Sequence, residues 1–259
     1  MAFAMVSHAF RMLFSNFGDA LKVSLVPFLI LLAITTWVQV SIFGGLNTSL
    51  IEDTPPAELG ANFALLQIIS AVASLVLSSW IAVGWHRFVL VEEYPSGYMP
   101  PFRSSEVFLY IWKLILIALA TVLMILPIVL VSQFLALAGG AGPNPMVAAV
   151  IGALSVMVAI FAMLVVVRWS VVLPAASIGK SMSLSQAWSY TKPLGFAPLW
   201  AFILVSLFAF VLFLVALITA FVPLVFLVVS AGVNLIATLL GVSVATTIYG
   251  VAVEGRQLT

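Results

Sequence analysis

Residues 168–196 read RWSVVLPAASIGKSMSLSQAWSYTKPLGF and join two long apolar stretches of the chain. Arg168, Lys180 and Lys192 in this segment are three of only nine Lys and Arg residues. The opening Arg-Trp pair is typical of the headgroup layer of a membrane, and Pro174 disturbs helix continuation because it lacks an N–H. We therefore expect a polar, partly helical link on one face of a membrane.

The second half of this segment predicts a short helix. Ser183 and Gln186 form the Ser-x-x-Gln pattern of a capping box, and Lys192, Pro193 and Gly195 end the helix. One weakly apolar face is formed, at helical spacing, by Leu184, Ala187, Trp188 and Thr191. This spacing favours a helix that lies in the membrane interface, and the alternative is an ordinary cytoplasmic loop with a cap.

The composition is that of an integral membrane protein. The chain is 64% hydrophobic and 7% charged, whereas about a quarter of residues are charged in soluble domains. The net charge of +1 leaves no large basic surface for nucleic acid. Because cysteine is absent, disulfides and thiolate chemistry are excluded.

The chain is predicted to form a single transmembrane domain, residues 1–259, with six apolar stretches. Each is long enough to cross a hydrocarbon core of ~30 Å at about 1.5 Å per residue. They lie at about residues 23–43, 61–84, 108–138, 146–167, 197–221 and 223–253. These stretches predict an all-α fold of six transmembrane helices arranged as three hairpins, with Pro223 at a first helical position. Because the third stretch is longer than a span needs, we expect it to tilt, to protrude or to kink at Pro127.

The basic residues assign the sides of the membrane. All of them fall before the first stretch, between the second and third or near the start of the third, between the fourth and fifth, or after the sixth. They are Arg11, Lys22, Arg87, Arg103, Lys113, Arg168, Lys180, Lys192 and Arg256. By the positive-inside rule both termini are cytoplasmic. The N-terminus does not resemble a cleaved signal peptide, so we expect the whole chain to be a mature multi-pass membrane protein.

Residues 3–17 predict a second interfacial helix. An apolar face is formed by Phe3, Val6, Phe10, Leu13 and Phe17, which follow each other at spacings of three and four. Gly18 and Asp19 offer a break before the first span. The alternative is that this segment extends the first span.

Short motifs in two loops carry a resemblance to a family. The order Arg168-Trp-Ser-x-x-Leu-Pro-Ala175, followed by Ser185-Gln-Ala-Trp-Ser189 and Thr191, resembles the six-helix membrane domain fused to some bacterial glycerophosphoryl diester phosphodiesterases, and related stand-alone inner-membrane proteins. Residues 85–92, WHRFVLVE, are similar to the loop after the second helix in stand-alone members. The resemblance implies a multi-pass location in a bacterial cytoplasmic (inner) membrane. In the fused enzymes the catalytic residues lie in a separate soluble domain, so no phosphodiesterase activity is carried over to this chain.

The spans carry little chemistry. No ionisable residue lies near the middle of a span, which counts against an ion-driven pump. Uncharged amides occur at Gln39, Gln67, Gln133 and Asn234. For Asn234, nearest a midplane, an interhelical hydrogen bond is favoured over a substrate contact, and the small-residue stripes Ser70-Ser74-Ser78 and Ala149-Ala153 indicate close helix packing.

No cofactor, metal or catalytic site is predicted. His8 and His86 are expected to be solvated or in contact with headgroups rather than to ligate haem. Adjacent Glu92 and Glu93 are typical of a solvated loop, and Glu52, Asp53 and Glu58 have no companion for hydrolysis. We therefore expect no enzymatic activity.

The candidate site is a group of basic and aromatic residues on the predicted cytoplasmic face. Basic pockets at this level bind anionic headgroups, and topological anchoring alone is the alternative. The candidate lipid contacts are Arg87, Arg103, Arg168, Lys180, Lys192, Trp85, Trp169 and Trp188.

These features favour a non-enzymatic membrane protein. We expect it to organise lipid or to accompany a larger membrane protein complex. The alternative is a carrier or translocator of a lipid-like or apolar small molecule, which a polar cavity around Asn234 and Gln67 would favour. A lipid-modifying enzyme would need a catalytic group that the sequence does not offer.

Overall fold

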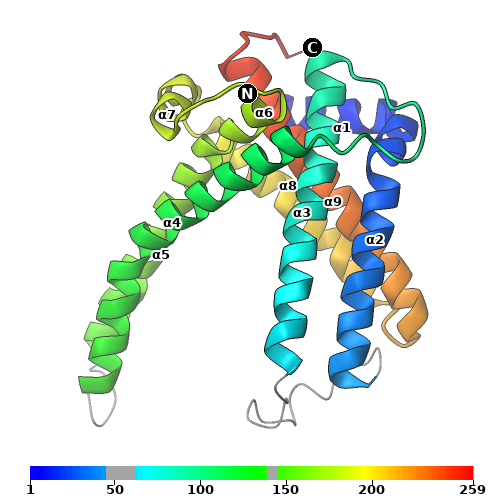
Figure 1. The fold of residues 1–259 in the computed structure, drawn as a ribbon. Helices are drawn as coiled ribbons and strands as arrows, with labels where there is room; N and C mark the ends of the chain where they lie inside the picture. The colour runs from blue at the N-terminus through cyan, green and yellow to red at the C-terminus, as the bar shows by residue number, and fades with distance from the viewer. Residues whose placement is uncertain (45–61, 139–144, 259) are drawn as a thin grey trace.

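A computed structural model describes residues 1–44, 62–138 and 145–258. All the regular secondary structure of these residues is helical, and six of the helices are long and apolar enough to cross a membrane, which confirms the predicted all-α membrane fold class. The predicted loops that contain residues 45–61 and 139–144 lie outside the described residues. The six long helices are α2 (Phe17–Phe43), α3 (Asn62–Val91), α4 (Ser104–Ala138), α5 (Pro145–Trp169), α8 (Ala197–Leu217) and α9 (Pro223–Ala252) (Figure 1).

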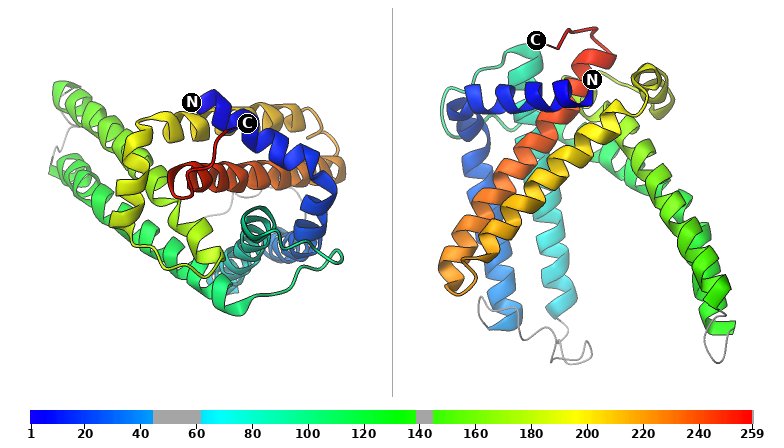
Figure 2. Two further views of the ribbon diagram at one scale, coloured as in Figure 1. Left: turned by 90° about the horizontal axis from the view of Figure 1, so that it is seen from above. Right: turned by 180° about the vertical axis from the view of Figure 1, so that it is seen from behind.

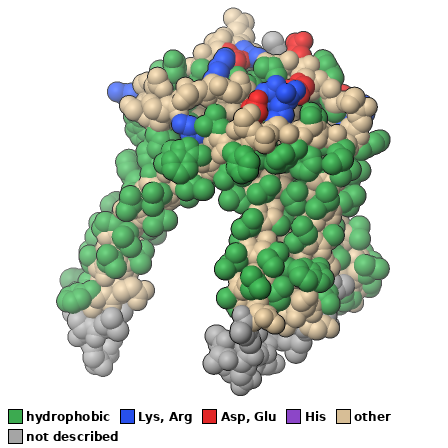
Figure 3. Space-filling model, viewed as in Figure 1, with side chains coloured by type: hydrophobic (Ala, Val, Ile, Leu, Met, Phe, Trp, Pro, Cys, Tyr) green, Lys and Arg blue, Asp and Glu red, His purple; other side chains and the backbone are tan. Residues whose placement is uncertain are grey.

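Shorter helices gather at one end of the long helices. They are α1 (Ala2–Ser15), α6 (Val172–Ser177), α7 (Leu184–Thr191) and the 3-10 turn η3 (Lys192–Leu194). Figure 2 shows α1 lying crosswise to the spans, with both termini nearby. The basic and acidic side chains visible in Figure 3 lie at this same end, which we call the charged end.

The long helices form three pairs that diverge from the charged end. The pair α4–α5 leans away from α2–α3, and the space-filling view shows a wide opening between them (Figure 3). The pair α8–α9 crosses obliquely relative to α2–α3 (Figures 1 and 2). Pro127 lies inside α4 without ending it.

The core lies where the pairs converge. Its largest fully buried side chains include Trp85 of α3 and Tyr249 of α9. The Trp85 Nε1–H donates a hydrogen bond to Ser243 Oγ over 2.9 Å, and His86 Nδ1 lies 2.8 Å from Thr246 Oγ1. Because these bonds join α3 to α9 inside the core, the expectation of solvated histidines is wrong for His86.

The N-terminal helix differs from its prediction in two details. The break before the first span falls at Asn16 rather than at Gly18 and Asp19, so α2 begins at Phe17. The side chains of α1 that are buried against the bundle are Met5, Ala9 and Leu13. Of the predicted apolar face, Phe3 is 77% exposed, because apolar residues occur on more than one side of this helix.

The link between α5 and α8 largely follows its prediction. Ser183 Oγ accepts a hydrogen bond from the Gln186 N–H, and the Gln186 side chain accepts one from the Ser183 N–H, which confirms the capping box. Ala187 and Thr191, two members of the predicted weakly apolar face of α7, are buried. The break after α5 precedes Pro174, which lies inside α6.

The link between α8 and α9 matches its prediction at one end only. Pro223 begins α9 as expected. However, α8 ends at Leu217 rather than near residue 221, and residues 218–222 form the turn between the two helices.

Candidate lipid-binding sites

The charged end holds two basic groups with different surroundings. In the first, Arg87 Nε lies 2.6 Å from Glu93 Oε2, and Arg103 Nη2 lies 2.6 Å from Glu93 Oε1. Glu106 Oε1 lies 3.6 Å from Arg87 Nη1. We call these four residues the paired cluster, since each guanidinium has a carboxylate partner.

Electrostatics within the paired cluster keep Glu93 ionised. Partial burial alone would raise the pKa of Glu93. Hydrogen bonds from Arg103 and Arg87 have a larger effect together, and the pKa of Glu93 lies below the ordinary value of 4.5. Arg87 Nη1 also donates to Ser177 O over 3.1 Å and so fixes α6 against α3. The charges of this cluster therefore largely cancel, and its arginines are occupied by internal contacts.

The second basic group surrounds α7. It consists of Lys113, Arg168, Lys180 and Lys192, which we call the α7 cluster. Residues 168–196 contain no Asp or Glu, and in the described part of the chain none of these four cations forms an ion pair. Lys113 was absent from the sequence-based candidates because it comes from α4, and only the folded chain brings it here.

Arg168 is the buried member of the α7 cluster. Only 7% of its surface is exposed, and its Nη2 donates to Gly195 O over 3.1 Å. Its Cζ lies 4.5 Å from the centre of the Trp188 ring, a cation–π contact. Its Nε has no hydrogen-bond partner among the described residues, so a buried guanidinium is held in place by neutral groups alone.

The other members reach the surface around α7. Lys113 Nζ donates to Met182 O over 2.9 Å and so ties α4 to the segment that leads into α7. Lys180 before α7 and Lys192 after it are exposed. Because a cation raises the local concentration of anions and like charges repel, this group favours an anionic ligand over an uncharged one.

The predicted aromatic contacts fall in different places. Trp85 is fully buried in the core, where it bonds Ser243. Trp169 and Trp188 are half-buried near the α7 cluster. The structure thus brings Arg168 and Trp188 into contact, with Lys180 before α7 and Lys192 after it. Trp85 lies in the core instead, and Arg87 and Arg103 pair with Glu93.

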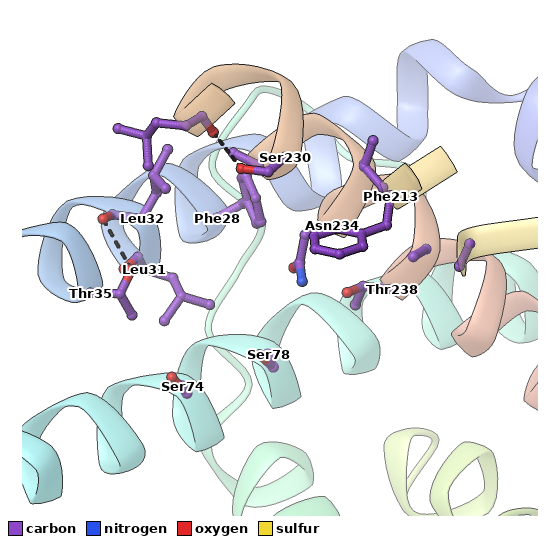
Figure 4. A pocket seen from close by; sticks show the side chains of 15 residues that line it. Phe28, Leu31, Leu32, Thr35, Ser74, Ser78, Phe213, Ser230, Asn234 and Thr238 are labelled. Carbon is purple, nitrogen blue, oxygen red and sulfur yellow. Dashed lines mark hydrogen bonds between the residues drawn. The ribbon is translucent and has the colours of Figure 1, made fainter. Parts of the chain in front are cut away.

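A cavity of about 680 Å³ lies elsewhere, between α2, α3, α8 and α9 (Figure 4). Its walls are mainly apolar side chains, among them Phe28, Leu31 and Phe213. Polar side chains from three helices also line it: Thr35, Ser74, Ser78, Ser230, Asn234 and Thr238.

The cavity changes the expectation for two sequence features. No described residue forms a hydrogen bond with the Asn234 side chain, so the predicted interhelical bond at this residue is wrong within the described chain. Ser74 and Ser78 face the cavity instead of a closely packed helix. Gln67 is exposed and does not line this space.

The fold and these features define a polytopic α-helical membrane protein with a cationic surface group at one end and a cavity among its spans. No protein-family model, no curated protein and no solved structure matches the chain. The resemblance to the membrane domain of phosphodiesterases therefore stays a prediction. Glu52, Asp53 and Glu58 lie outside the described residues.

Proposed function

We propose that this chain is a non-enzymatic, lipid-organising protein of a bacterial inner membrane, which holds the headgroups of anionic phospholipids at the α7 cluster. The observation that carries the proposal is the absence of a carboxylate partner for Lys113, Arg168, Lys180 or Lys192 within the described residues. A lipid phosphate supplies the missing negative charge.

The depth of the cluster suits a headgroup. Arg168 lies at the end of the transmembrane helix α5, and Lys180 and Lys192 flank the short helix α7. Arg and Lys at span ends place their charges in the headgroup layer. A phosphodiester has oxygens that accept hydrogen bonds from more than one cation, so a bound lipid would connect cations of α4, α5 and the segments that flank α7.

The test removes exposed cations that have no role in folding contacts. We expect the double variant Lys180→Gln, Lys192→Gln to retain several-fold less phosphatidylglycerol or cardiolipin than the parent, because each basic residue near the surface contributes about 1 kcal/mol to anionic lipid binding. Native mass spectrometry of the protein purified in mild detergent measures the retained lipid. Arg168→Gln should lower it further.

Arg256→Gln is the matched control. It removes one positive charge at the same end of the molecule, but Arg256 Nε is paired with Glu254 Oε2 at 2.7 Å. The proposal requires that this variant retains lipid as the parent does. Equal lipid content in all variants would reject the proposed function. The α7 cluster would then serve only to orient the chain in the membrane.

A further inference from the structure

We infer that the cavity between α2, α3, α8 and α9 is a binding site for an uncharged amphiphile, whose alcohol or carbonyl group bonds Asn234 and whose aliphatic chain lies along the apolar walls. This site is distinct from the α7 cluster. The inference does not depend on the proposed function, because different helices and different side chains form the two sites.

The first step of the argument is the position of Asn234. It lies eleven residues past Pro223, which is about 16 Å into the membrane-spanning helix α9 at 1.5 Å per residue. Its amide has two donors and a carbonyl acceptor, and none has a partner among the described residues. A polar group without partners at this depth is costly, since hydrocarbon offers no hydrogen bonds.

The second step is the shared direction of the polar groups. Figure 4 shows Asn234 and Thr238 of α9 on one side of the space and Ser74 and Ser78 of α3 on the other. Thr35 Oγ1 donates to Leu31 O over 2.9 Å, and Ser230 Oγ donates to Leu227 O over 3.1 Å. These two hydroxyls bond their own helices, whereas no described residue bonds the side chains of Asn234, Thr238, Ser74 and Ser78. Of these four, the amide of Asn234 has the most donors and acceptors to offer a ligand.

The third step is charge. Among the described residues that line the cavity none is ionisable, and the charged side chains of the visible face gather at the charged end (Figure 3). A net charge moved to this depth has no counter-ion and loses its hydration. The ligand is therefore uncharged, whereas the α7 cluster selects anions.

The fourth step is size and shape. A volume of about 680 Å³ lies within the range of small-molecule sites, roughly 300–1,000 Å³. The cavity arises because α8–α9 crosses obliquely relative to α2–α3, so the pairs separate away from the core (Figures 1 and 2). Apolar walls with a few convergent polar groups match a molecule that has one polar group and an aliphatic chain.

The experiment uses two probes with the same acyl chain. The purified full-length protein is titrated with 1-oleoylglycerol and with oleate at pH 8, and binding is read by native mass spectrometry. We expect saturable binding of one 1-oleoylglycerol and at least tenfold weaker binding of oleate. Equal binding of the two probes would overturn the assignment of an uncharged ligand.

Two pairs of variants locate the site. Asn234→Leu removes the amide and should weaken binding of 1-oleoylglycerol about tenfold, the effect of one lost hydrogen bond, while Gln67→Leu removes an exposed amide outside the cavity and should leave binding unchanged. Ala237→Phe fills the cavity and should abolish binding. Ala153→Phe adds the same bulk on an exposed face of α5 and should not.

Other outcomes reject the inference. Unchanged binding in both Asn234→Leu and Ala237→Phe would place the ligand elsewhere. If the parent is instead a dimer that Asn234→Leu converts to monomers, with no saturable binding of 1-oleoylglycerol, a second copy of the chain satisfies the amide. Thermal unfolding of all four variants is the control for folding. A transition like that of the parent shows that a variant is folded, so that its weaker binding is due to the changed site.

Discussion

Glu93 is the residue on which the geometry of the paired cluster depends. Its two carboxylate oxygens lie 2.6 Å from Arg87 Nε and 2.6 Å from Arg103 Nη2. Through Arg87 it also stabilises the contact with Ser177 O in α6. Removing its charge therefore affects three segments of the chain at once.

We predict that Glu93→Gln lowers stability at neutral pH by about 1–2 kcal/mol, since two charge-assisted hydrogen bonds weaken in a partly exposed setting. The folded pKa of Glu93 lies below its ordinary value of 4.5. Its contribution is therefore full above pH 4.5 and is lost as the pH falls through the folded pKa. Thermal unfolding in detergent between pH 7 and pH 3 measures this.

The neighbouring acid gives the control. Glu92 forms no ion pair with a described residue, so Glu92→Gln should unfold at nearly the parent temperature at every pH. If the difference between Glu93→Gln and the parent persists unchanged down to pH 3, ionisation of Glu93 is not its source.

Single residues of this cluster could not be assigned from the sequence. Two adjacent acids in a loop are typical of a solvated segment, and for Glu92 this prediction stands. Glu93 differs only because the chain turns after α3 and directs it back toward Arg87. That turn includes Glu92 at a φ of 55°, a conformation that side-chain type alone does not indicate.

At the scale of elements, α2 and α3 approach each other closely at Gly84. A Cβ atom there would lie 2.7 Å from Val23 Cγ1. Val23 is itself buried, so its methyl group has little room to move. Glycine at this position lets two membrane-spanning helices approach each other.

We predict that Gly84→Ala destabilises the protein by about 1–3 kcal/mol through overpacking. Val23→Ala in the same chain should restore part of the loss, because it removes the methyl group that clashes. Unfolding in a denaturing detergent titration measures both variants. Gly152→Ala, where a Cβ meets nothing within 4 Å, is the matched control, and an equal loss there would refute the packing explanation.

Elements were predictable where a strong local signal exists. Long apolar stretches gave six helices, and the Ser183 to Gln186 pattern gave the start of α7. The orientation of α1 was not predictable in detail. Apolar residues occur on more than one side of this helix, so periodicity does not show which side is buried against the bundle.

At the scale of the whole molecule, hydropathy does not determine which helices pack together. All six spans satisfy the same requirement of an apolar surface, so the sequence contains no direct sign that α4–α5 leans away or that α8–α9 crosses the other pair. The cavity follows from that crossing. The sequence predicted only part of its polar lining, as separate serines and one asparagine that nothing linked to a common space.

The orientation of the whole molecule gives the last prediction. The charged end is expected in the cytoplasm, because all basic residues lie on that side of the six spans. The chain has no cysteine, so single cysteines report their side of the membrane directly. Tyr94, 69% exposed, lies at the charged end, and Phe221, 91% exposed, lies in the turn between α8 and α9 at the other.

In intact bacterial cells that express the chain, we expect a membrane-impermeant maleimide to label Phe221→Cys at once and Tyr94→Cys only after permeabilisation. The cysteine-free parent measures background labelling. The opposite pattern would place the charged end outside, where the leaflet facing the α7 cluster has a different lipid composition. The same pair of variants therefore tests the topology and the leaflet in which the proposed lipid site would act.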